Sequence, residues 1–342
     1  MRDGHILLTG GAGYIGSHIA VALAEQGLRP LIVDNFANAR PSVIDRIARI
    51  TGTPVPAEKI DILDRPAMQD LFARYPIRSV IHLAALKAVG ESVEKPLDYF
   101  QTNISGFIQL MQVMRDAGCF RLVFSSSATV YGEADQVPTP ETAPLTHTSP
   151  YAYTKIACEQ IIEQAEAADP RWAIGRLRYF NPVGAHPSGL IGEDPNQRPN
   201  NLMPLIAKVA AGEMDEIKVF GDDYDTPDGT GVRDYIHVSD LAEGHVKSLA
   251  ALDATGQSHL VNLGTGRGHS VLEMIRAYSR ACNHALPFSV VPRRAGDVPV
   301  YLADPARAAD LLGFRTTRDL DEMCRTSWNW IQTGAADAVA NS

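Results

Sequence analysis

A glycine-rich turn between two apolar runs constrains the fold of this chain more than any other feature. The run HILLT, residues 5–9, leads into TGGAGYIG, which places Gly10, Gly13 and Gly16 at the start of a helical pattern. The next apolar run, PLIVD, ends in Asp34. Glycine permits a tight turn and a close approach of a ligand to the backbone, and the free N–H groups of a helix N-terminus attract a pyrophosphate. The pattern predicts the strand, turn and helix of a dinucleotide-binding domain.

The acidic residue at the end of the second run predicts which dinucleotide binds. A carboxylate in this position accepts hydrogen bonds from the adenosine ribose and repels a 2′-phosphate, so Asp34 favours NAD over NADP. Arg40 is the nearby cation that would favour a 2′-phosphate, but it lies beyond the end of the run. The glycines alone would also fit a turn that serves packing, and Asp34 argues against that alternative.

Apolar runs alternate with helical patterns through the first half of the chain. Continuously apolar strands separated by helices are typical of a parallel sheet that is covered on both faces. The fold class is therefore α/β, a doubly wound parallel sheet of the Rossmann type, in a dinucleotide-binding domain expected over residues 1–180. The expected strands are 5–9, 30–34, 59–62, 79–84, 121–126 and 172–180, and the expected helices are 15–27, 66–74, 98–117 and 151–168.

The character of the chain changes after residue 180. Residues 181–200 are rich in Pro, Gly and Asn and predict a long irregular segment, which in a compact protein is usually functional or disordered. We expect a second, smaller α/β lobe over residues 181–342 that binds the substrate. Its expected elements are helices at 203–211 and 271–283 and a strand at 217–220, while residues 234–265, with a helical period over 234–252, are expected to pack back on the first domain.

Composition and charge exclude several classes of protein. The chain has 342 residues and a net charge of −9, without a basic block, so neither nucleic acid nor a membrane is an expected partner. No apolar run approaches the roughly 20 residues of a membrane span, and the N-terminal run is too short for a signal peptide, which predicts a cytoplasmic protein. The four cysteines are widely spaced, and His82, His186 and His237 fit no metal spacing, so we expect neither disulfides nor a metal.

The stretch SPYAYTK contains two tyrosines, either of which could be a catalytic base. Ser149 and Pro150 are a good start signal for a helix. Residues four apart share a helix face, so Tyr151 and Lys155 can enter the same cleft, whereas Tyr153 points away. These residues alone also fit a capped helix with two surface aromatics.

A serine adds a third member to this set. Ser127 follows the strand expected at 121–126, and ligands bind at the carboxyl ends of the strands in open α/β sheets. A phenol with its ordinary pKa of about 10 needs its anion stabilised before it can act as a base, and a nearby ammonium ion lowers that pKa. Ser127, Tyr151 and Lys155 therefore predict proton removal from a sugar or alcohol hydroxyl while hydride leaves the carbon.

Seven blocks of the sequence resemble the UDP-glucose 4-epimerases, a family within the extended short-chain dehydrogenases/reductases. The blocks are TGGAGYIGSH, HLAALKAVGES, FSSSATVYG, PYAYTK, RYFNPVGAHPSG, NNLMP and DGTGVRDYIHV, and the resemblance runs from residue 5 to about residue 305. It implies an isomerase of galactose metabolism that interconverts UDP-galactose and UDP-glucose through a transient 4-keto sugar with tightly bound NAD. It also implies that Ser127, Tyr151 and Lys155 are catalytic, with Tyr151 as the base, and that the protein is a homodimer.

The resemblance further implies two sets of binding residues. The NAD set is Gly10, Gly13, Tyr14, Ile15, Gly16, Asp34, Asn35, Asp61, Ile62, Leu83, Ala84, Ala85, Lys87, Thr102, Ser127, Tyr151, Lys155 and Phe180. The UDP-sugar set is Lys87, Ser127, Tyr151, Asn181, Asn201, Leu202, Phe220, Arg233, Tyr235, Val271, Arg294, Asp297 and Tyr301. Two arginines suit a diphosphate. One departure is Thr102, which stands before Asn103 where the family often has two asparagines, and its hydroxyl can still bind the cofactor.

Three other functions remain open from the residues. An epimerase for another UDP-sugar, such as an N-acetylhexosamine or a uronic acid, is the nearest. A nucleotide-sugar 4,6-dehydratase usually carries Asp-Glu after its active-site Thr, whereas Ala128 and Thr129 follow Ser127 here. A non-catalytic NAD-binding sensor would be expected to lack the tyrosine and lysine pair.

Overall fold

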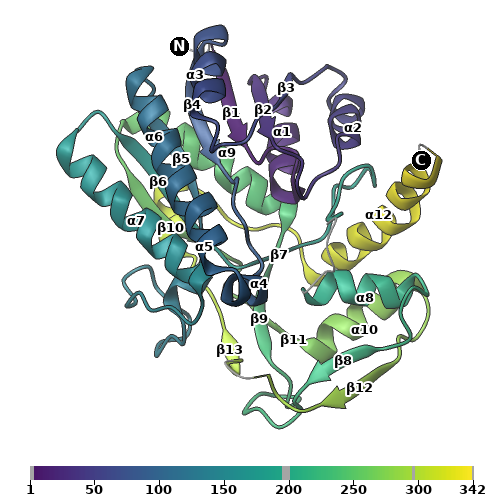
Figure 1. Ribbon diagram of the computed structural model, residues 1–342. Helices are drawn as coiled ribbons and strands as arrows, with labels where there is room; N and C mark the ends of the chain where they lie inside the picture. Colours follow the sequence, from purple (N-terminus) through teal and green to yellow (C-terminus); the bar gives the residue numbers. More distant parts are fainter. Residues whose placement is uncertain (1–3, 195–200, 295–296, 341–342) are drawn as a thin grey trace.

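The core of the molecule is one sheet of seven parallel strands (Figure 1). The computed structural model describes residues 4–194, 201–294 and 297–340. The strand order is β10-β6-β5-β4-β1-β2-β3, and it reverses between β1 and β4, where α/β sheets open a crevice for ligands. The doubly wound α/β prediction is confirmed. The strands are β1 His5–Thr9, β2 Pro30–Asp34, β3 Ala57–Lys59, β4 Ile77–His82, β5 Arg121–Ser127, β6 Ala173–Tyr179 and β10 His259–Leu263.

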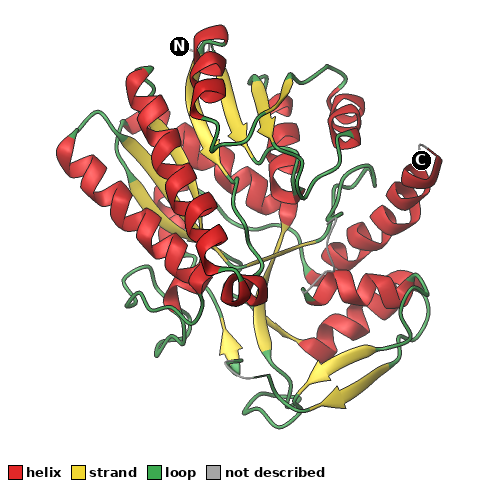
Figure 2. Ribbon diagram, in the orientation of Figure 1, coloured by secondary structure: helices red, strands yellow, loops and turns green. Residues whose placement is uncertain are grey.

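Helices cover both faces of this sheet (Figure 2). Alternate residues of β1 point to opposite faces: Ile6 and Leu8 enter one buried cluster, and Leu7 enters the other. Burial on both faces explains why the strands read as continuous apolar runs. The first face carries α1 Tyr14–Glu25, α2 Ser42–Thr51, α9 Val238–Thr255 and α11 Ala306–Leu312, and the second carries α3 Arg65–Arg74, α6 Gly106–Asp116 and α7 Pro150–Ala168.

The remaining elements form a smaller group beside the carboxyl ends of the main strands (Figure 1). Three helices, α8 Leu202–Ala210, α10 Val271–Cys282 and α12 Leu320–Ala340, share one apolar cluster. Two small sheets complete the group: β7 Asn181–Val183, β9 Val232–His237, β11 Gly268–Ser270 and β13 Val300–Tyr301 in one, and β8 Ile217–Phe220 with β12 Phe288–Val291 in the other. Strand β10 belongs to the seven-stranded sheet, and α9 packs on one face of that sheet. The proposed domain boundary near residue 180 remains a prediction.

Short helices connect β4 to the long helix α6. They are α4 Val89–Glu94 and α5 Pro96–Tyr99, followed by a π-helical turn at Phe100–Ser105. A short 3₁₀ turn, Ala128–Tyr131, follows β5. The expected helix at 98–117 is therefore interrupted, and such π turns are frequent at functional sites.

Two element boundaries predicted from the sequence are wrong. The third strand is Ala57–Lys59 and not 59–62, because the Asp61 side chain accepts the Leu63 N–H at 2.9 Å and turns the chain toward α3. The helical period over 234–252 begins as strand β9, since β9 pairs with three neighbouring strands. The helix starts at Val238, and the preceding His237 caps it by accepting the Ser239 N–H at 3.0 Å.

Other differences are smaller. The helix expected at 203–211 is α8, one residue earlier at each end. Residues 181–194 of the expected irregular segment contain only the short strand β7, and residues 195–200 lie outside the described part of the chain.

Each of the three histidines considered above hydrogen-bonds a hydroxyl group. His82 hydrogen-bonds Thr9 at 2.7 Å, His237 hydrogen-bonds Thr326 at 3.0 Å, and His186 hydrogen-bonds Ser188 at 2.8 Å. All four cysteines are free thiols. Within residues 4–194, 201–294 and 297–340, no group of three acidic, histidine or cysteine side chains could hold a metal, and no helix is long and apolar enough to span a membrane.

Candidate active site

The sheet and helix α7 bring together the three residues expected to act in catalysis. Ser127 ends β5, and Tyr151 and Lys155 lie one turn apart at the start of α7. The helix starts at Pro150, with the Ser149 hydroxyl accepting the Ala152 N–H at 3.2 Å. All three candidate side chains are buried. The sequence-based prediction of the helix start is confirmed.

The two tyrosines of α7 lie in different environments. Tyr151 is 8% exposed and Tyr153 is 43% exposed. The ring of Tyr153 packs against Phe100 and His147 at centroid distances of 5.7 and 5.2 Å. Tyr151 is therefore the tyrosine on the same face as Lys155.

Lys155 is buried and bonded to the backbone of β5. Its ammonium donates a hydrogen bond to the Ser125 carbonyl at 2.8 Å and lies 5.9 Å from the centroid of the Tyr151 ring. Burial lowers the pKa of Lys155 to about 8, while Cys158 and Glu159 act to raise it. A buried amine in this position carries charge near neutral pH and loses it in mild alkali.

The phenol of Tyr151 behaves differently from the expectation. Burial raises the pKa of Tyr151 to about 12, and a hydrogen bond with Ser127 is the factor that lowers it. The Lys155 ammonium is not among the groups that lower this pKa in the protein alone. The Ser127 oxygen accepts from the N–H and hydroxyl of Thr129 at 3.2 and 3.0 Å, which leaves the serine's own proton for another acceptor.

A buried ion pair supports the catalytic helix, and sequence reasoning missed it. Arg178 on β6 binds Glu159 on α7 through Nη2 and Oε2 at 2.5 Å, with side-chain exposures of 3% and 1%. Ser126 also donates to Glu159 at 2.5 Å, and Arg178 donates to the Tyr131 hydroxyl at 3.1 Å. Glu159 follows Lys155 by one helical turn, so the pair ties the catalytic helix to the sheet.

The glycine-rich turn has the shape that a dinucleotide needs. Gly10 has φ +72°, and a Cβ there would lie 2.7 Å from the Ala84 nitrogen. A Cβ on Gly16 would lie 2.4 Å from the Gly10 carbonyl. A Cβ on Gly13 would meet only that carbonyl, at 3.3 Å, so the space beside Gly13 is open. Gly10 and Gly16 thus serve close packing, while Gly13 leaves room for a pyrophosphate.

Acidic and amide groups gather at the end of β2. Asp34 is buried and accepts the Ala12 and Phe36 N–H groups at 3.1 and 2.8 Å. Burial raises the pKa of Asp34, and these two hydrogen bonds lower it. Each carboxylate oxygen keeps a lone pair for a ribose hydroxyl. Asn35 donates to Asp61 at 2.9 Å, which places both beside Asp34 as expected for the adenosine side.

The segment after β4 lies against the same crevice. Leu83 N–H donates to the Thr9 carbonyl at 2.9 Å, and Ala84 contacts the glycine turn. Asn103 holds the next residue: its side chain accepts the Leu86 N–H at 2.8 Å and donates to the Leu86 carbonyl at 2.9 Å. Thr102 lies beside Asn103 in the π turn. Sequence reasoning named Thr102 and missed the positioning role of Asn103.

The other expected NAD residues lie in several different environments. Ile62 is buried in the core, and Ile15 is partly buried against it. Tyr14 donates its hydroxyl to the Gly184 carbonyl at 2.6 Å. Lys87 pairs with Glu193 at 3.4 Å, next to an ion pair of Arg40 with Asp194 at 2.9 Å. Ala85 follows Ala84 in the same loop.

Four of the expected UDP-sugar residues, three of them charged, lie in contact with one another. Arg233 on β9 lies 3.9 Å from the Asp297 carboxylate. The Asp297 N–H donates to the Arg294 carbonyl at 3.4 Å, and the Arg294 guanidinium stacks 3.8 Å from the centroid of the Phe220 ring. The arrangement gathers two guanidinium groups and an aromatic face in one place, as a nucleoside diphosphate requires.

The remaining expected substrate residues lie on neighbouring elements. Tyr301 donates its hydroxyl to the Ala128 carbonyl, next to Ser127, and its ring lies 5.2 Å from that of Phe180. Asn181 donates to the Asp234 carbonyl at 3.2 Å. Leu202, Tyr235 and Val271 belong to the apolar cluster of the smaller group, and Asn201 is the exposed cap of α8.

Together, the sheet, the glycine turn and the buried Ser–Tyr–Lys set define a dinucleotide-binding α/β protein of the short-chain dehydrogenase/reductase class. The model of the NAD dependent epimerase/dehydratase family matches residues 6–264. The chain belongs to this family.

Named relatives match almost the whole chain in sequence or in structure. The UDP-glucose 4-epimerase of Yersinia pestis is 51% identical over 327 residues, covering 95% of this chain and 97% of the relative. The crystal structure of the enzyme of that name from Stenotrophomonas maltophila, with bound NAD and formylated UDP-arabinopyranose, has a TM-score of 0.96 and 51% identity, covering 98% of this chain and 100% of the other. The Bifidobacterium longum UDP-glucose 4-epimerase with NAD⁺ and UDP has a TM-score of 0.92 and 46% identity, covering 97% and 99%.

Proposed function

We propose that the chain is a UDP-glucose 4-epimerase that interconverts UDP-galactose and UDP-glucose with tightly bound NAD. The buried Ser127, Tyr151 and Lys155 at the carboxyl edge of the sheet carry this proposal. The open space at Gly13 and the free lone pairs of Asp34 fit NAD. Bound there, NAD would supply the acceptor and donor of a hydride for the sugar C4.

The three catalytic residues have separate roles in this proposal. Tyr151 takes the proton of the sugar 4-hydroxyl, directly or through Ser127, whose hydroxyl proton is not used by Thr129. Lys155 supplies a fixed positive charge beneath the phenol. Because burial raises the pKa of Tyr151, the phenolate is stabilised by the hydrogen bond with Ser127 and would be stabilised further by the positive charge that bound NAD⁺ would supply.

Substrate binding in this proposal separates the nucleotide from the sugar. Arg233 and Arg294 hold the diphosphate, and Asp297 accepts from the uridine ribose. Phe220 supplies an aromatic face beside Arg294. A firmly held UDP leaves the hexose free to turn, so that hydride returns to the opposite face of C4.

The first test concerns the cofactor. Because each cycle returns its hydride, we expect purified protein to release NAD(H) on denaturation and to show no stoichiometric accumulation of NADH with UDP-glucose. Absorbance near 340 nm during turnover and chromatography of the released nucleotide provide the measurements. A requirement for added NADP, or steady NADH production, would contradict the proposal.

Tyr301 is expected to limit the size of the sugar. Its ring lies against Phe180 and its hydroxyl binds the Ala128 carbonyl, so it fills space next to Ser127. Excess volume in a packed site costs roughly 1–3 kcal/mol, about ten- to a hundredfold in kcat/KM. We expect Tyr301→Cys to raise kcat/KM for UDP-N-acetylglucosamine relative to UDP-glucose by such a factor.

Tyr301→Phe is the matched control because it keeps the ring and should keep the preference for the smaller sugars. If Tyr301 only packs the structure, Tyr301→Cys will lower both activities together. A wild-type protein that already uses UDP-N-acetylglucosamine as well as UDP-glucose would refute the size limit.

We also propose a homodimer. Apolar side chains are exposed on neighbouring helices α4, α5 and α7: Val93 is 63% exposed, Leu97 76% and Tyr153 43%. Association of two copies would remove this surface from water. Sedimentation equilibrium should give twice the chain mass, and a Leu97→Glu variant should shift the equilibrium toward the monomer. A monomeric wild type would contradict the proposal.

Two further expectations, a cytoplasmic location and a part in galactose metabolism, stay predictions.

A further inference from the structure

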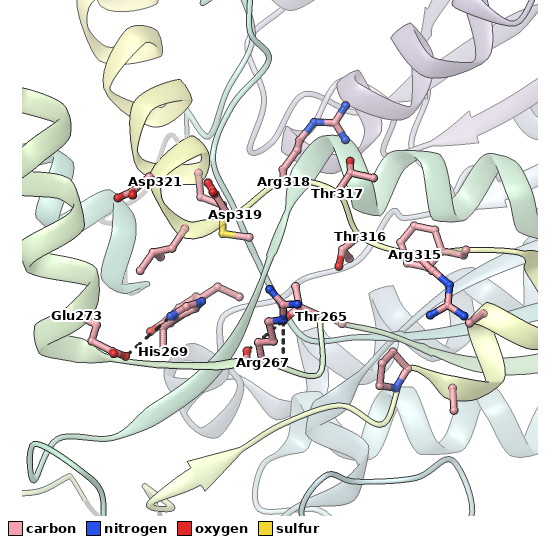
Figure 3. Close-up of a pocket in the computed structure, with 18 of the residues that line it drawn as sticks. Thr265, Arg267, His269, Glu273, Arg315, Thr316, Thr317, Arg318, Asp319 and Asp321 are labelled. Atoms are coloured by element: carbon pink, nitrogen blue, oxygen red, sulfur yellow. Dashed lines mark hydrogen bonds and ion pairs between the residues drawn. The ribbon is translucent and has the colours of Figure 1, made fainter.

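A second cavity, of about 690 Å³, lies among α10, α11, α12 and the turn between β10 and β11 (Figure 3). Its lining contains none of Ser127, Tyr151, Lys155, Arg233 and Arg294. Tyr235 is the residue that it shares with the expected substrate set. The proposed catalytic function therefore leaves this cavity unexplained. Its basic lining residues are Arg267, His269, Arg276, Arg280, Arg315 and Arg318.

The acidic groups that line the cavity already have partners. Asp321 pairs with Arg280 at 2.5 Å. Asp319 accepts the Glu322 N–H at 2.9 Å, and Glu273 accepts the Ser270 N–H at 2.8 Å. These three carboxylates are therefore occupied with an ion pair or helix capping.

The arginines of the lining fall into those with an acidic partner and those without one. Arg318 is bound by Asp240 and by Glu243, the latter at 3.0 Å. Arg267 and Arg315 form no ion pair with any residue that the structure describes. Arg276 has no ion pair within 4 Å among the described residues. Its charge acts at longer range, where it lowers the pKa of Asp228. Three arginines of the lining, all exposed, thus have no ion-pair partner within 4 Å in the described part of the chain.

The unpaired cations come from separate elements. Arg267 lies in the β10–β11 turn, Arg276 on α10 and Arg315 between α11 and α12. Figure 3 shows Arg267 and Arg315 in the cavity, while the guanidinium of Arg318 points away from both. The first residues of α12, a helix of 21 residues, also line the cavity. The N-terminus of a helix carries a partial positive charge, which adds to that of the arginines.

We propose that this cavity binds a small phosphate-bearing molecule at a site separate from the UDP-sugar. Guanidinium forks on different elements match the oxygens of a phosphate or diphosphate. Ligand pockets typically measure about 300–1,000 Å³, so the volume admits an organic phosphate as well as the inorganic ion. The Thr316 hydroxyl lines the cavity as a further donor.

Calorimetric titration of inorganic pyrophosphate into NAD-loaded protein saturated with UDP tests this site. UDP occupies the proposed substrate site, so binding that persists reports the second cavity. We expect Arg267→Gln/Arg315→Gln to weaken this binding by about ten- to a hundredfold, as the loss of hydrogen bonds to charged groups predicts. Conversion of UDP-galactose should be unchanged in this variant, which also shows that it is folded.

Arg325→Gln is the matched control. Arg325 lies on α12, its side chain is 62% exposed, it pairs with Glu322, and it is not among the cavity residues. Pyrophosphate binding should survive this substitution. Loss of binding when UDP is present, or equal binding by the double variant and the wild type, would overturn the proposal. Titration of a sugar phosphate into the same UDP-saturated protein then separates an inorganic from an organic ligand.

Discussion

Replacing Tyr151 by phenylalanine is expected to lower kcat/KM for UDP-galactose by about 10²–10⁴-fold, the usual effect of losing a general base. The substitution removes the hydroxyl and keeps the ring, which is 8% exposed and lies 5.9 Å from the Lys155 ammonium. Binding of NAD and UDP should persist, because the Tyr151 ring is kept and the other expected contacts, among them Asp34, Arg233 and Arg294, are unchanged. Initial rates over a range of substrate concentrations provide the measurement.

Tyr153→Phe is the matched control for this experiment. The same chemical change two residues along α7 alters a side chain that is 43% exposed and packs against Phe100 and His147. Its activity should stay close to that of the wild type. Equal losses from the two substitutions would mean that the position on the helix face does not select the base.

Replacing Arg178 by methionine is expected to destabilise the protein by about 3–5 kcal/mol, because it leaves the buried carboxylate of Glu159 without its cation. The two side chains are 3% and 1% exposed. The hydrogen bond from Ser126 at 2.5 Å would remain and compensate only in part. The free energy of unfolding from urea titrations of the NAD-loaded protein measures the loss.

Two further variants make this prediction specific. Arg178→Met/Glu159→Leu removes both charges and should recover much of the lost stability, since an apolar pair of similar volume is often tolerated. Lys208→Met breaks an exposed ion pair with Glu213 and should change stability little. A loss for Arg178→Met no larger than that for Lys208→Met would contradict the account of the buried pair.

Much of the main sheet could be predicted because its strands are buried on both faces. HILLT and PLIVD carry apolar side chains toward each of two clusters, so their patterns need no knowledge of their partners. The start of α7 could be predicted for a similar reason, because its signals, Ser149 and Pro150, belong to the helix itself. The positions of Ser127 and Tyr151 then follow from a strand end and a helix start.

Features that depend on distant partners could not be predicted. Strand β13 is two residues long, and it exists because Val300 and Tyr301 pair with β9. Glu159 and Arg178 lie in the expected helix 151–168 and the expected strand 172–180, and no local pattern indicates that the fold buries them together. Asn103 acts through the backbone of Leu86, a contact that no sequence period indicates.

The pKa of Tyr151 also could not be predicted from the sequence. The sequence places a lysine one turn away, but it does not reveal that the ammonium donates to the Ser125 carbonyl or that burial raises the phenol's pKa.

The most direct test of the central claim is incubation of the purified protein with UDP-galactose, without added oxidant or reductant. Separation of the products by chromatography should show UDP-glucose accumulating to an equilibrium that is also reached from UDP-glucose. The Tyr151→Phe protein should approach that equilibrium far more slowly. Recovery of unchanged UDP-galactose from protein that contains NAD, or its conversion only into a keto sugar or an unsaturated product, would contradict the assignment as a 4-epimerase.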